Sequence, residues 1–354
     1  MYFRMTEVSI YEGEEGKFFN ALRSVQSLFP LIRMRAGARR WEPAMYQYVI
    51  KRILFTIPVL LGAAFLVYAI MYLTPGTPAE LILGITAKPE DIAALNHKLG
   101  ADLPFFQQFF NYLKNILLHF DFGTSYRNGK PVFDSIMARF PCTFRLAVAS
   151  TITGCGLGIV LGIISAVKQY SWIDNILTTL AMFFSAMPGF WLGLMLMILF
   201  SLKLGWLPFS GVDTWKGYVL PTITLALGNA ASDMRLTRST MLETIRQDYI
   251  RTARSKGVPE KKVIWKHALR NALLPVVTSM GMGFGSSLGG AVICETVFGM
   301  PGLGMLIVSS IRQKDTPVVL AATLFLAALF CVVMLIVDIL YAYIDPRIKA
   351  LYKS

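Results

Sequence analysis

The sequence predicts an all-α integral membrane protein with six membrane-spanning helices. Hydrophobic residues make up 55% of the 354-residue chain and charged residues only 16%, whereas soluble domains are about 25% charged. Five nearly uncharged stretches exceed 20 residues, and about 20 helical residues are needed to cross the hydrocarbon of a bilayer. These stretches are residues 53–73, 146–167, 176–202, 272–294 and 317–337.

Charge places a sixth span at residues 217–232, a stretch of only 16 residues. Lys and Arg gather on the cytoplasmic side of membrane proteins. Residues 33–52 contain six of them, and residues 232–271 contain ten against four acids. These two blocks and the basic tail, residues 346–354, share one side only if residues 217–232 cross the membrane. We therefore expect a multi-pass protein of the inner or plasma membrane with both termini in the cytoplasm.

The net charge of +13 agrees with this topology and with contact to anionic lipid of the bilayer. No nucleic-acid-binding motif accompanies the basic residues, so nucleic acid is not an expected partner. The four cysteines are scattered, without a CxxC pair or a Cys/His cluster. Neither a metal site, a cofactor nor a disulfide framework is therefore expected.

An intramembrane enzyme and a passive channel are both disfavoured. His97, His119 and His267 all fall in expected loops, and no HExxH motif or intramembrane pair of aspartates is present. A charged filter ring, which a channel would use, is not visible either. Residues 123–131 (GTSYRNGKP) differ from a phosphate-binding loop, which has four residues between its glycines and Ser or Thr after its Lys. No catalytic residue is therefore assigned.

Residues 1–52 are expected to form a cytoplasmic N-terminal segment before the first span. Within residues 1–44 apolar side chains recur at helical spacing, although Pro30 interrupts the pattern. A helix lying on the membrane surface, a disordered leader, and a mis-assigned start with Met45 as the true first residue are the three interpretations. The recurring side chains are Phe18, Leu22, Val25, Phe29 and Ile32.

An external helical segment is expected over residues 74–141. It begins where TPGTP at residues 74–78 stops the helix of the first span. A short helix is predicted over residues 89–99 and an aromatic-rich one over residues 103–122. This segment either packs as a cap on the membrane part or offers a docking surface to an external partner. The residues predicted to share one face of the second helix are Phe105, Phe109, Tyr112, Ile116 and Phe120.

A five-helix core is expected over residues 142–345, with a cytoplasmic loop at residues 232–272. Two series of glycines at four-residue spacing predict close helix packing. Pro188 is expected to kink the span at residues 176–202. The glycines are Gly154, Gly158 and Gly162 in one span and Gly281, Gly285 and Gly289 in another.

The cytoplasmic loop contains a predicted helix-turn-helix at residues 248–275, DYIRTARSKGVPEKKVIWKHALRNALLP. Gly257 ends the first helix, and Pro259 suits the first turn of the second. Two short helices at an angle make a stiff knob that fits a cleft of a soluble partner. A solvated basic loop on lipid headgroups is the alternative, but it does not explain the Ala–Gly–Pro punctuation. One face of the first helix is marked by Ile245, Tyr249 and Ala253, and the second helix continues through Val263, Ile264, His267 and Ala268 to Asn271.

Seven short motifs carry a family resemblance. They are DYIRTARSKG (248–257), HALRNALLP (267–275), ETVFGMPGLG (295–304), DILYAYIDPRI (338–348), FDFGTSYRNGKPV (120–132), SAMPGFWLGL (185–194) and LGWLPFSG (204–211). Together they resemble the permeases of ABC importers, in the oligopeptide/dipeptide branch, from about residue 45 to the end. The chain departs from the broader signature at Arg251, where Glu is expected, and at Arg270, where Pro is expected.

The resemblance implies a type I ABC importer permease, the transmembrane half of a pump. Its partners would be a second homologous permease, two separate ATPase subunits and an external solute-binding protein that delivers di- or oligopeptides. Nickel and glutathione importers use similar permeases and are the alternatives. By this resemblance four residues contribute to ATPase coupling, with Gly257 fixing the turn and Tyr249 packing in the ATPase cleft. These residues are Tyr249, Ala253, Gly257 and His267.

Two acids in or beside the spans are candidates for further roles. Asp338 follows 21 uncharged residues and lies near the cytoplasmic end of the last span. A structural ion pair with Arg235 or Arg238 is expected there rather than proton transfer. Glu295 lies just past the fifth span, where it either lines the outer mouth of the translocation path or caps the helix end.

Overall fold

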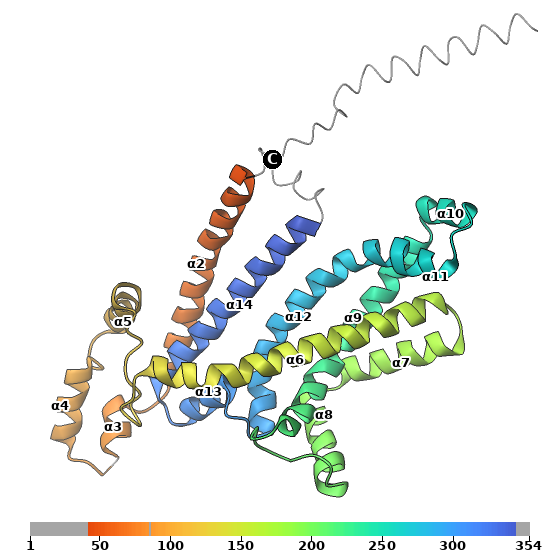
Figure 1. Ribbon diagram of the computed structural model, residues 1–354. Helices are drawn as coiled ribbons and strands as arrows, with labels where there is room; N and C mark the ends of the chain where they lie inside the picture. Colours follow the sequence, from red (N-terminus) through yellow and green to blue (C-terminus); the bar gives the residue numbers. More distant parts are fainter. Residues whose placement is uncertain (1–41, 85, 345–354) are drawn as a thin grey trace, which may run out of the picture. The chain divides into compact units, whose positions relative to one another are not determined.

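The computed structural model describes residues 42–84 and 86–344 of the chain. Two units are distinguished, Met1–Ile50 and Lys51–Ser354, and the fold described here is that of the second. The expectations for residues 1–41 and for the tail, residues 346–354, lie outside the described residues. Throughout the described part the regular elements are helices (Figure 1), apart from an isolated bridge between Thr124 and Pro131. The predicted all-α class is therefore confirmed.

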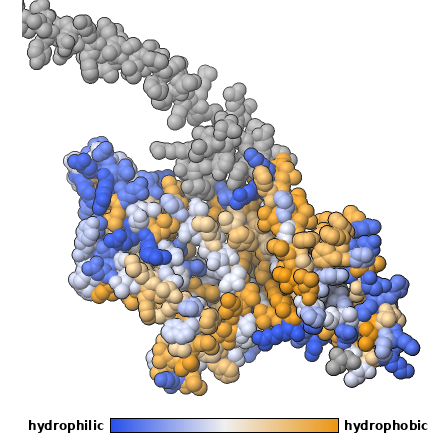
Figure 2. Space-filling model, turned by 180° about the vertical axis from the view of Figure 1, so that it is seen from behind, coloured by the Kyte–Doolittle hydropathy of each residue, from blue (hydrophilic) through white to orange (hydrophobic). Residues whose placement is uncertain are grey.

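Four helices in the described part are long and apolar enough to cross a membrane, and each coincides with a predicted span. Apolar residues cover the middle of the molecule in Figure 2, and hydrophilic residues gather toward its ends. The qualifying stretches are Val49–Leu73 within α2 (Glu42–Leu73), Val132–Val167 (α6), Glu260–Val297, whose main part is α12 (Leu269–Val297), and Thr316–Ile339 within α14 (Thr316–Ile344).

The predicted span at residues 176–202 is broken rather than kinked. Helix α7 (Trp172–Ala186) ends before Pro188, and α8 (Gly189–Leu196) leaves at an angle of 104° and continues into the π-helical stretch η1 (Met197–Lys203). Met187 is extended, with ψ of 130°, because the residue before a proline avoids the helical region. The expected single kinked helix is therefore wrong, and the chain leaves the helical conformation at this point.

Helix α9 (Val219–Ile245) contains the predicted sixth span and is 27 residues long. It carries Asp233, Arg235 and Arg238 and is not among the helices that qualify as spans by composition. It packs along α6 and also contacts α7, α8 and α12. Because much of its surface is covered by other helices, α9 does not need the apolar composition of a lipid-exposed helix.

Small residues make the α6–α9 contact close. A Cβ atom added at Gly154 would lie 2.9 Å from the carbonyl oxygen of Ala226, and one at Gly158 would lie 2.7 Å from Cβ of Asp233. The first glycine series therefore packs helices together, as predicted. In the second series Gly281 and Gly285 meet α14, whereas Gly289 has nothing within 4 Å and does not fit the prediction.

The segment between α2 and α6 contains α3 (Pro78–Leu83), α4 (Pro89–Leu99) and α5 (Phe105–His119). The two predicted helices are confirmed in α4 and α5. The external segment expected at residues 74–141 overlaps the start of α6, which begins at Val132. Phe105 and Phe109 pack against Tyr68 of α2, as the face prediction implied. Phe120 departs from that face, since it ends α5 with φ of 50° and is exposed.

Candidate functional site

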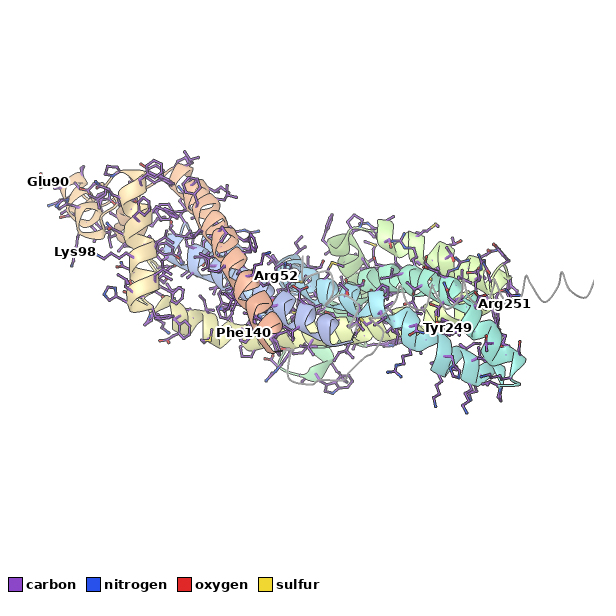
Figure 3. The ribbon with its side chains drawn as sticks, turned by 90° about the horizontal axis from the view of Figure 1, so that it is seen from above. Arg52, Glu90, Lys98, Phe140, Tyr249 and Arg251 are labelled. Atoms are coloured by element: carbon purple, nitrogen blue, oxygen red, sulfur yellow. The ribbon has the colours of Figure 1, made fainter. Side chains whose placement is uncertain are left out.

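The most distinctive surface feature is the basic knob, defined as residues 246–270, between α9 and α12. It consists of α10 (Asp248–Ser255), a turn, the short helix α11 (Glu260–Lys262) and the π-helical stretch η3 (Val263–Ala268). The predicted helix-turn-helix is thus confirmed, but its second helix is not a separate short one, because α11, η3 and α12 follow one another without a break over Glu260–Val297. In Figure 3, Tyr249 and Arg251 of the knob lie at the opposite end from Glu90 and Lys98 of α4.

Gly257 forms the turn in the way that the sequence predicts. Its φ is +74°, in the left-handed region that glycine adopts without a steric penalty. Its N–H donates to the carbonyl of Arg254 at 2.9 Å, and that of Val258 donates to Ala253 at 3.3 Å, so α10 is closed at its C-terminus. A Cβ atom at Gly257 would meet nothing within 4 Å. The requirement for glycine is therefore conformational and does not come from packing.

The inner side of the basic knob is part of the apolar core. Ile250, Val263 and Ala268 are fully buried. They pack in one cluster with residues of α6, α9 and α12, and Ala253 packs against that cluster from its edge. A force applied to the knob therefore reaches those helices directly, because close-packed interiors deform little. The neighbours in the cluster are Ile163, Ala166, Met241, Ile264 and Ala272.

The outer side of the basic knob presents two aromatic side chains. Tyr249 is 43% exposed, and its hydroxyl accepts a hydrogen bond of 2.8 Å from Nδ2 of Asn271. Trp265 is 53% exposed and was not predicted as a site residue. The sequence did contain a signal for Trp265: when Val263 and Ala268 face inward, the helical spacing places Trp265 on the outer side. His267 is half-buried, so of the predicted residues Tyr249 and Gly257 are the exposed ones.

An ion pair joins the two halves of the basic knob across its turn. Arg254 donates from Nε to Glu260 Oε2 at 3.0 Å and from Nη2 to Oε1 at 2.6 Å. This two-point geometry is the favourable form of an arginine–carboxylate contact. Both side chains are more than a third exposed, so solvent screens the pair. It therefore fixes the angle of the turn more than it stabilises the fold.

A buried ion pair lies at the base of the basic knob. Asp174, near the start of α7, is 2% exposed and accepts two hydrogen bonds of 2.7 Å from Nε and Nη2 of Arg238 on α9. Ser165 and the backbone N–H of Tyr170 also donate to this carboxylate. The turn between α6 and α7 is therefore tied to α9, and sequence reasoning did not identify Asp174.

The same ion pair corrects the expectation for Asp338. Arg238 is occupied by Asp174, and Asp338 instead lies 2.8 Å from Nη2 of Arg52 on α2. An ion pair is present at Asp338, but the expected partners, Arg235 and Arg238, are wrong. The pair joins the first helix of the fold to the last one described.

Glu295 caps a helix instead of lining a mouth. Its side chain is fully buried and accepts hydrogen bonds from Thr143 Oγ1 at 2.6 Å and from the N–H groups of Gly304 and Met305 at 2.7 and 3.2 Å. Thr143 in turn accepts from the N–H of Leu303 at 2.8 Å. A carboxylate at the N-terminus of α13 (Leu303–Arg312) is favourable. The prediction of a mouth-lining Glu295 is therefore wrong, and the helix that it caps is α13, not its own.

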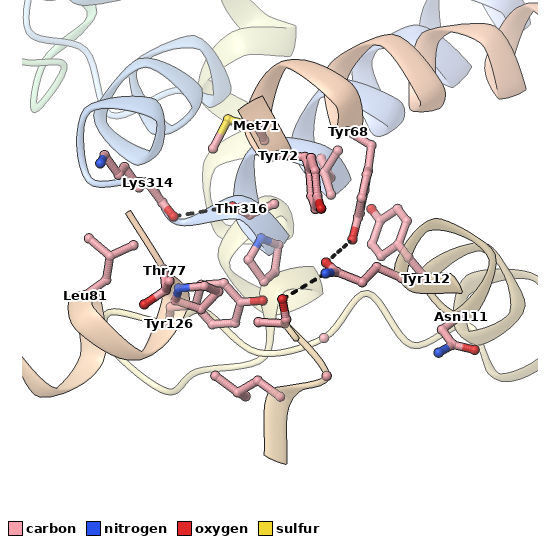
Figure 4. Close-up of a pocket in the computed structure, with 18 of the residues that line it drawn as sticks. Tyr68, Met71, Tyr72, Thr77, Leu81, Asn111, Tyr112, Tyr126, Lys314 and Thr316 are labelled. Carbon is pink, nitrogen blue, oxygen red and sulfur yellow. Dashed lines mark hydrogen bonds between the residues drawn. The ribbon is translucent and has the colours of Figure 1, made fainter. Parts of the chain in front are cut away.

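A cavity of about 480 Å³, the cap cavity, lies among α2, α3, α5 and the start of α14 (Figure 4). Gln108 is fixed at its wall, accepting from the hydroxyl of Tyr68 at 2.9 Å and donating to the carbonyls of Ala101 and Leu103 at 3.0 and 2.8 Å. Burial raises the pKa of Tyr126 to about 12, so its hydroxyl stays neutral. The cap cavity is thus lined by both apolar and polar groups, with Asp121 and Lys314 as its charged lining residues.

A second cavity of about 220 Å³, the break cavity, lies at the interruption between α7 and α8. Residues of α9 and α12 complete its wall. None of its lining residues is charged. Its polar residues are Ser185, Thr224, Asn229, Ser232, Ser286 and Ser287.

Two protein families together match nearly all of the described residues. The family of binding-protein-dependent transport system inner membrane components matches residues 158–350. The N-terminal region of binding-protein-dependent transport system membrane components matches residues 45–147.

Individual proteins give the same picture. The glutathione transport system permease protein GsiC of Salmonella choleraesuis (strain SC-B67) is 44% identical over 305 residues, 86% of this chain and 99% of the relative. GsiC of Escherichia coli (strain K12) is 43% identical over the same lengths. An inward-facing conformation of the MetNI methionine ABC transporter has a similar fold, with a TM-score of 0.53 at 17% identity, covering 61% of this chain and 99% of that one.

Proposed function

This chain belongs to the family of binding-protein-dependent transport system inner membrane components, and from that premise we propose that it imports small peptides. It is a membrane-embedded permease subunit of an ABC importer of the oligopeptide/dipeptide type, a family whose ATPase is a separate subunit. Glutathione, itself a tripeptide, is the second candidate substrate, because the name of GsiC specifies glutathione transport. Nickel is the remaining alternative.

The proposed complex contains this chain, a second homologous permease, two ATPase subunits and an external solute-binding protein. The basic knob is the element on which the ATPases act. The observation that carries this role is its two-sided construction: Ile250 and Val263 are built into the core, whereas Tyr249 and Trp265 face outward. Exposed aromatic residues are frequent anchors of protein interfaces. Closure of the ATPases around ATP would then move α9 and α12 with the knob as one rigid piece.

The proposed topology has six crossings with both termini in the cytoplasm, and α9 supplies the sixth. Its 27 residues extend about 40 Å, more than the ~30 Å of a hydrocarbon core. Two of its charged groups have partners within the bundle: Arg238 meets Asp174, and Asp233 accepts from Ser279 Oγ at 2.7 Å and Cys155 Sγ at 3.1 Å. Polar groups that are satisfied in this way cost far less within a membrane.

The segment between α2 and α6 is proposed to face the outside and to meet the solute-binding protein. The opposite placement of Glu90 and Lys98 relative to Tyr249 and Arg251 in Figure 3 supports this assignment. Its exposed charges on α4 and the polar and charged groups that line the cap cavity suit a wet protein interface better than lipid.

Uptake into vesicles tests the function directly. The complex, purified with its partner subunits and reconstituted, should accumulate radiolabelled trialanine or glutathione when ATP and the solute-binding protein are present. Accumulation of nickel alone would overturn the peptide assignment and favour the metal alternative.

The side of the membrane that the basic knob faces can be tested without knowing the substrate. Lys261→Cys places a thiol on the exposed side of the basic knob, and the native Cys142, Cys155 and Cys294 are buried. In intact cells this thiol should resist a membrane-impermeant maleimide and react after permeabilisation. Labelling from outside alone would refute the ATPase-coupling role.

A further inference from the structure

The break cavity lies where a membrane-length apolar stretch loses its helical conformation. Met187 and Pro188 are non-helical between α7 and α8. Within a bilayer, irregular backbone is tolerated where it is buried in protein or lines a water-filled space. A cavity of about 220 Å³ lies beside this break, and its other walls belong to α9 and α12, the two helices that hold the basic knob.

Two glycines in the wall, Gly189 and Gly228, have no close neighbour at the Cβ position, and only Gly228 lies within a long helix. Gly228 lies in the middle of α9, where glycine is unfavourable for a helix. A Cβ atom there would meet nothing within 4 Å, in contrast to Gly154 and Gly158 on the facing helix α6, whose Cβ positions are blocked by α9. Gly228 therefore keeps a space open instead of letting two helices approach.

The polar groups of the wall are neutral and suit amides. Asn229 Nδ2 donates to Ser287 Oγ at 2.9 Å, which fixes both side chains at the wall. Hydroxyl and carboxamide groups both donate and accept hydrogen bonds, as a peptide backbone does. A transition-metal ion would instead favour imidazole, thiolate or carboxylate ligands, none of which lines this cavity.

The break cavity is open on one side. Ser185, Gly228, Ser232 and Ser286 are exposed there in the single chain. Such groups are unfavourable against lipid tails but suitable beside water or a second polar wall. A second permease in the assembly would complete the enclosure on that side.

We propose that the break cavity is this chain's wall of the translocation path and that it recognises the backbone amides of a passing peptide through Asn229, which the buried Ser287 holds in place. This inference rests on the proposed peptide importer. Recognition of amides through neutral groups makes the wall indifferent to peptide side chains. Selection among peptides then belongs to other parts of the complex.

Filling the cavity tests the inference. Gly228→Phe projects a ring into open space and should lower trialanine uptake at least tenfold, while ATP hydrolysis and complex assembly are kept. Gly62→Phe and Gly156→Phe are matched controls, because a Cβ atom at either position also meets nothing within 4 Å and neither residue lines the cavity. Unchanged uptake by Gly228→Phe, or an equal loss in both controls, would overturn the inference.

A smaller substitution covers the case in which Gly228→Phe does not assemble. Gly228→Cys should react with a water-soluble methanethiosulfonate in the assembled complex, and trialanine supplied during turnover should slow that reaction. A thiol that is unreactive, or equally reactive with and without trialanine, would contradict the path assignment. If wild-type vesicles take up trialanine, the proposed peptide importer is retained whatever the labelling of Gly228→Cys shows. If wild-type vesicles take up no trialanine, the proposed function itself is contradicted.

Discussion

The basic knob and the Glu295 joint, the latter comprising Glu295, Thr143 and the first residues of α13, use charge in opposite ways. Both follow long helices, and both contain charged residues that drew attention in the sequence. In the knob Ile250, Val263 and Ala268 are buried, and the charges remain outside. In the joint the charge itself is buried, and each of its hydrogen bonds stays within the chain. The buried carboxylate of Glu295 makes its hydrogen bonds within the chain and so positions a helix. The exposed charges of the basic knob remain available to a partner.

The largest effect is expected from removing the carboxylate of the joint. Glu295→Ala leaves the N–H groups of Gly304 and Met305 and the hydroxyl of Thr143 without their acceptor. The free energy of unfolding should fall by about 3 kcal/mol, the upper range for hydrogen bonds to a charged group. Thermal unfolding of the purified protein in detergent measures this change.

Glu295→Gln separates the two roles once considered for this residue. Its amide oxygen still accepts hydrogen bonds, so most of the stability and the uptake activity should remain. Loss of uptake with an unchanged melting temperature would indicate a path residue and would break the contrast between joint and knob.

The buried pair at the base of the knob should rank second. Asp174→Ala leaves Arg238, which is only 26% exposed, without its carboxylate. We expect a loss of about 2 kcal/mol in unfolding free energy, less than for Glu295 because Arg238 can turn toward water. The double variant Asp174→Ala with Arg238→Ala should recover part of this loss. A double variant whose loss equals the sum of the two single losses would show that the two residues act independently.

Substituting Gly257 in the turn of the knob should have the third-largest effect on the free energy of unfolding and the largest effect on uptake. Gly257→Val forces a β-branched residue to φ of +74° at a cost of about 1–2 kcal/mol. Uptake should fall at least tenfold while ATP hydrolysis continues, because the knob would change shape without the core unfolding. Gly257→Asn is the control, since asparagine adopts left-handed conformations readily. If valine and asparagine give equal uptake, the turn does not couple the two activities.

The parts that sequence predicted well are those governed by local rules. Uncharged runs of 20 or more residues predicted the regions of α2, α6, α12 and α14 because lipid demands apolar surface along the whole helix. Gly257 and Pro259 marked the knob because a turn needs particular backbone conformations. In each case the residues that carry the signal are within a few sequence positions of the helix or turn that they predict.

The parts that sequence did not predict depend on neighbours distant in the chain. Asp338 was recognised as a paired charge, but its partner Arg52 lies on the first helix, and no local pattern identifies it. Asp174 lies in the first turn of α7, a position common for acids, so nothing in the local sequence distinguishes it. Pro188 is compatible with both a kink and a break, and only the packing around the break cavity distinguishes the two.

The smallest expected effect comes from the exposed pair across the turn of the knob. Arg254 and Glu260 meet in a two-point geometry, yet their side chains are 39% and 56% exposed. A double-mutant cycle with Arg254→Ala and Glu260→Ala should give a coupling free energy of about 0.5 kcal/mol, because water and salt screen such pairs. Raising the ionic strength should reduce that coupling further. A coupling above about 2 kcal/mol would mean that the knob, like the Glu295 joint, depends on charge for its stability, and the contrast between the two regions would no longer hold.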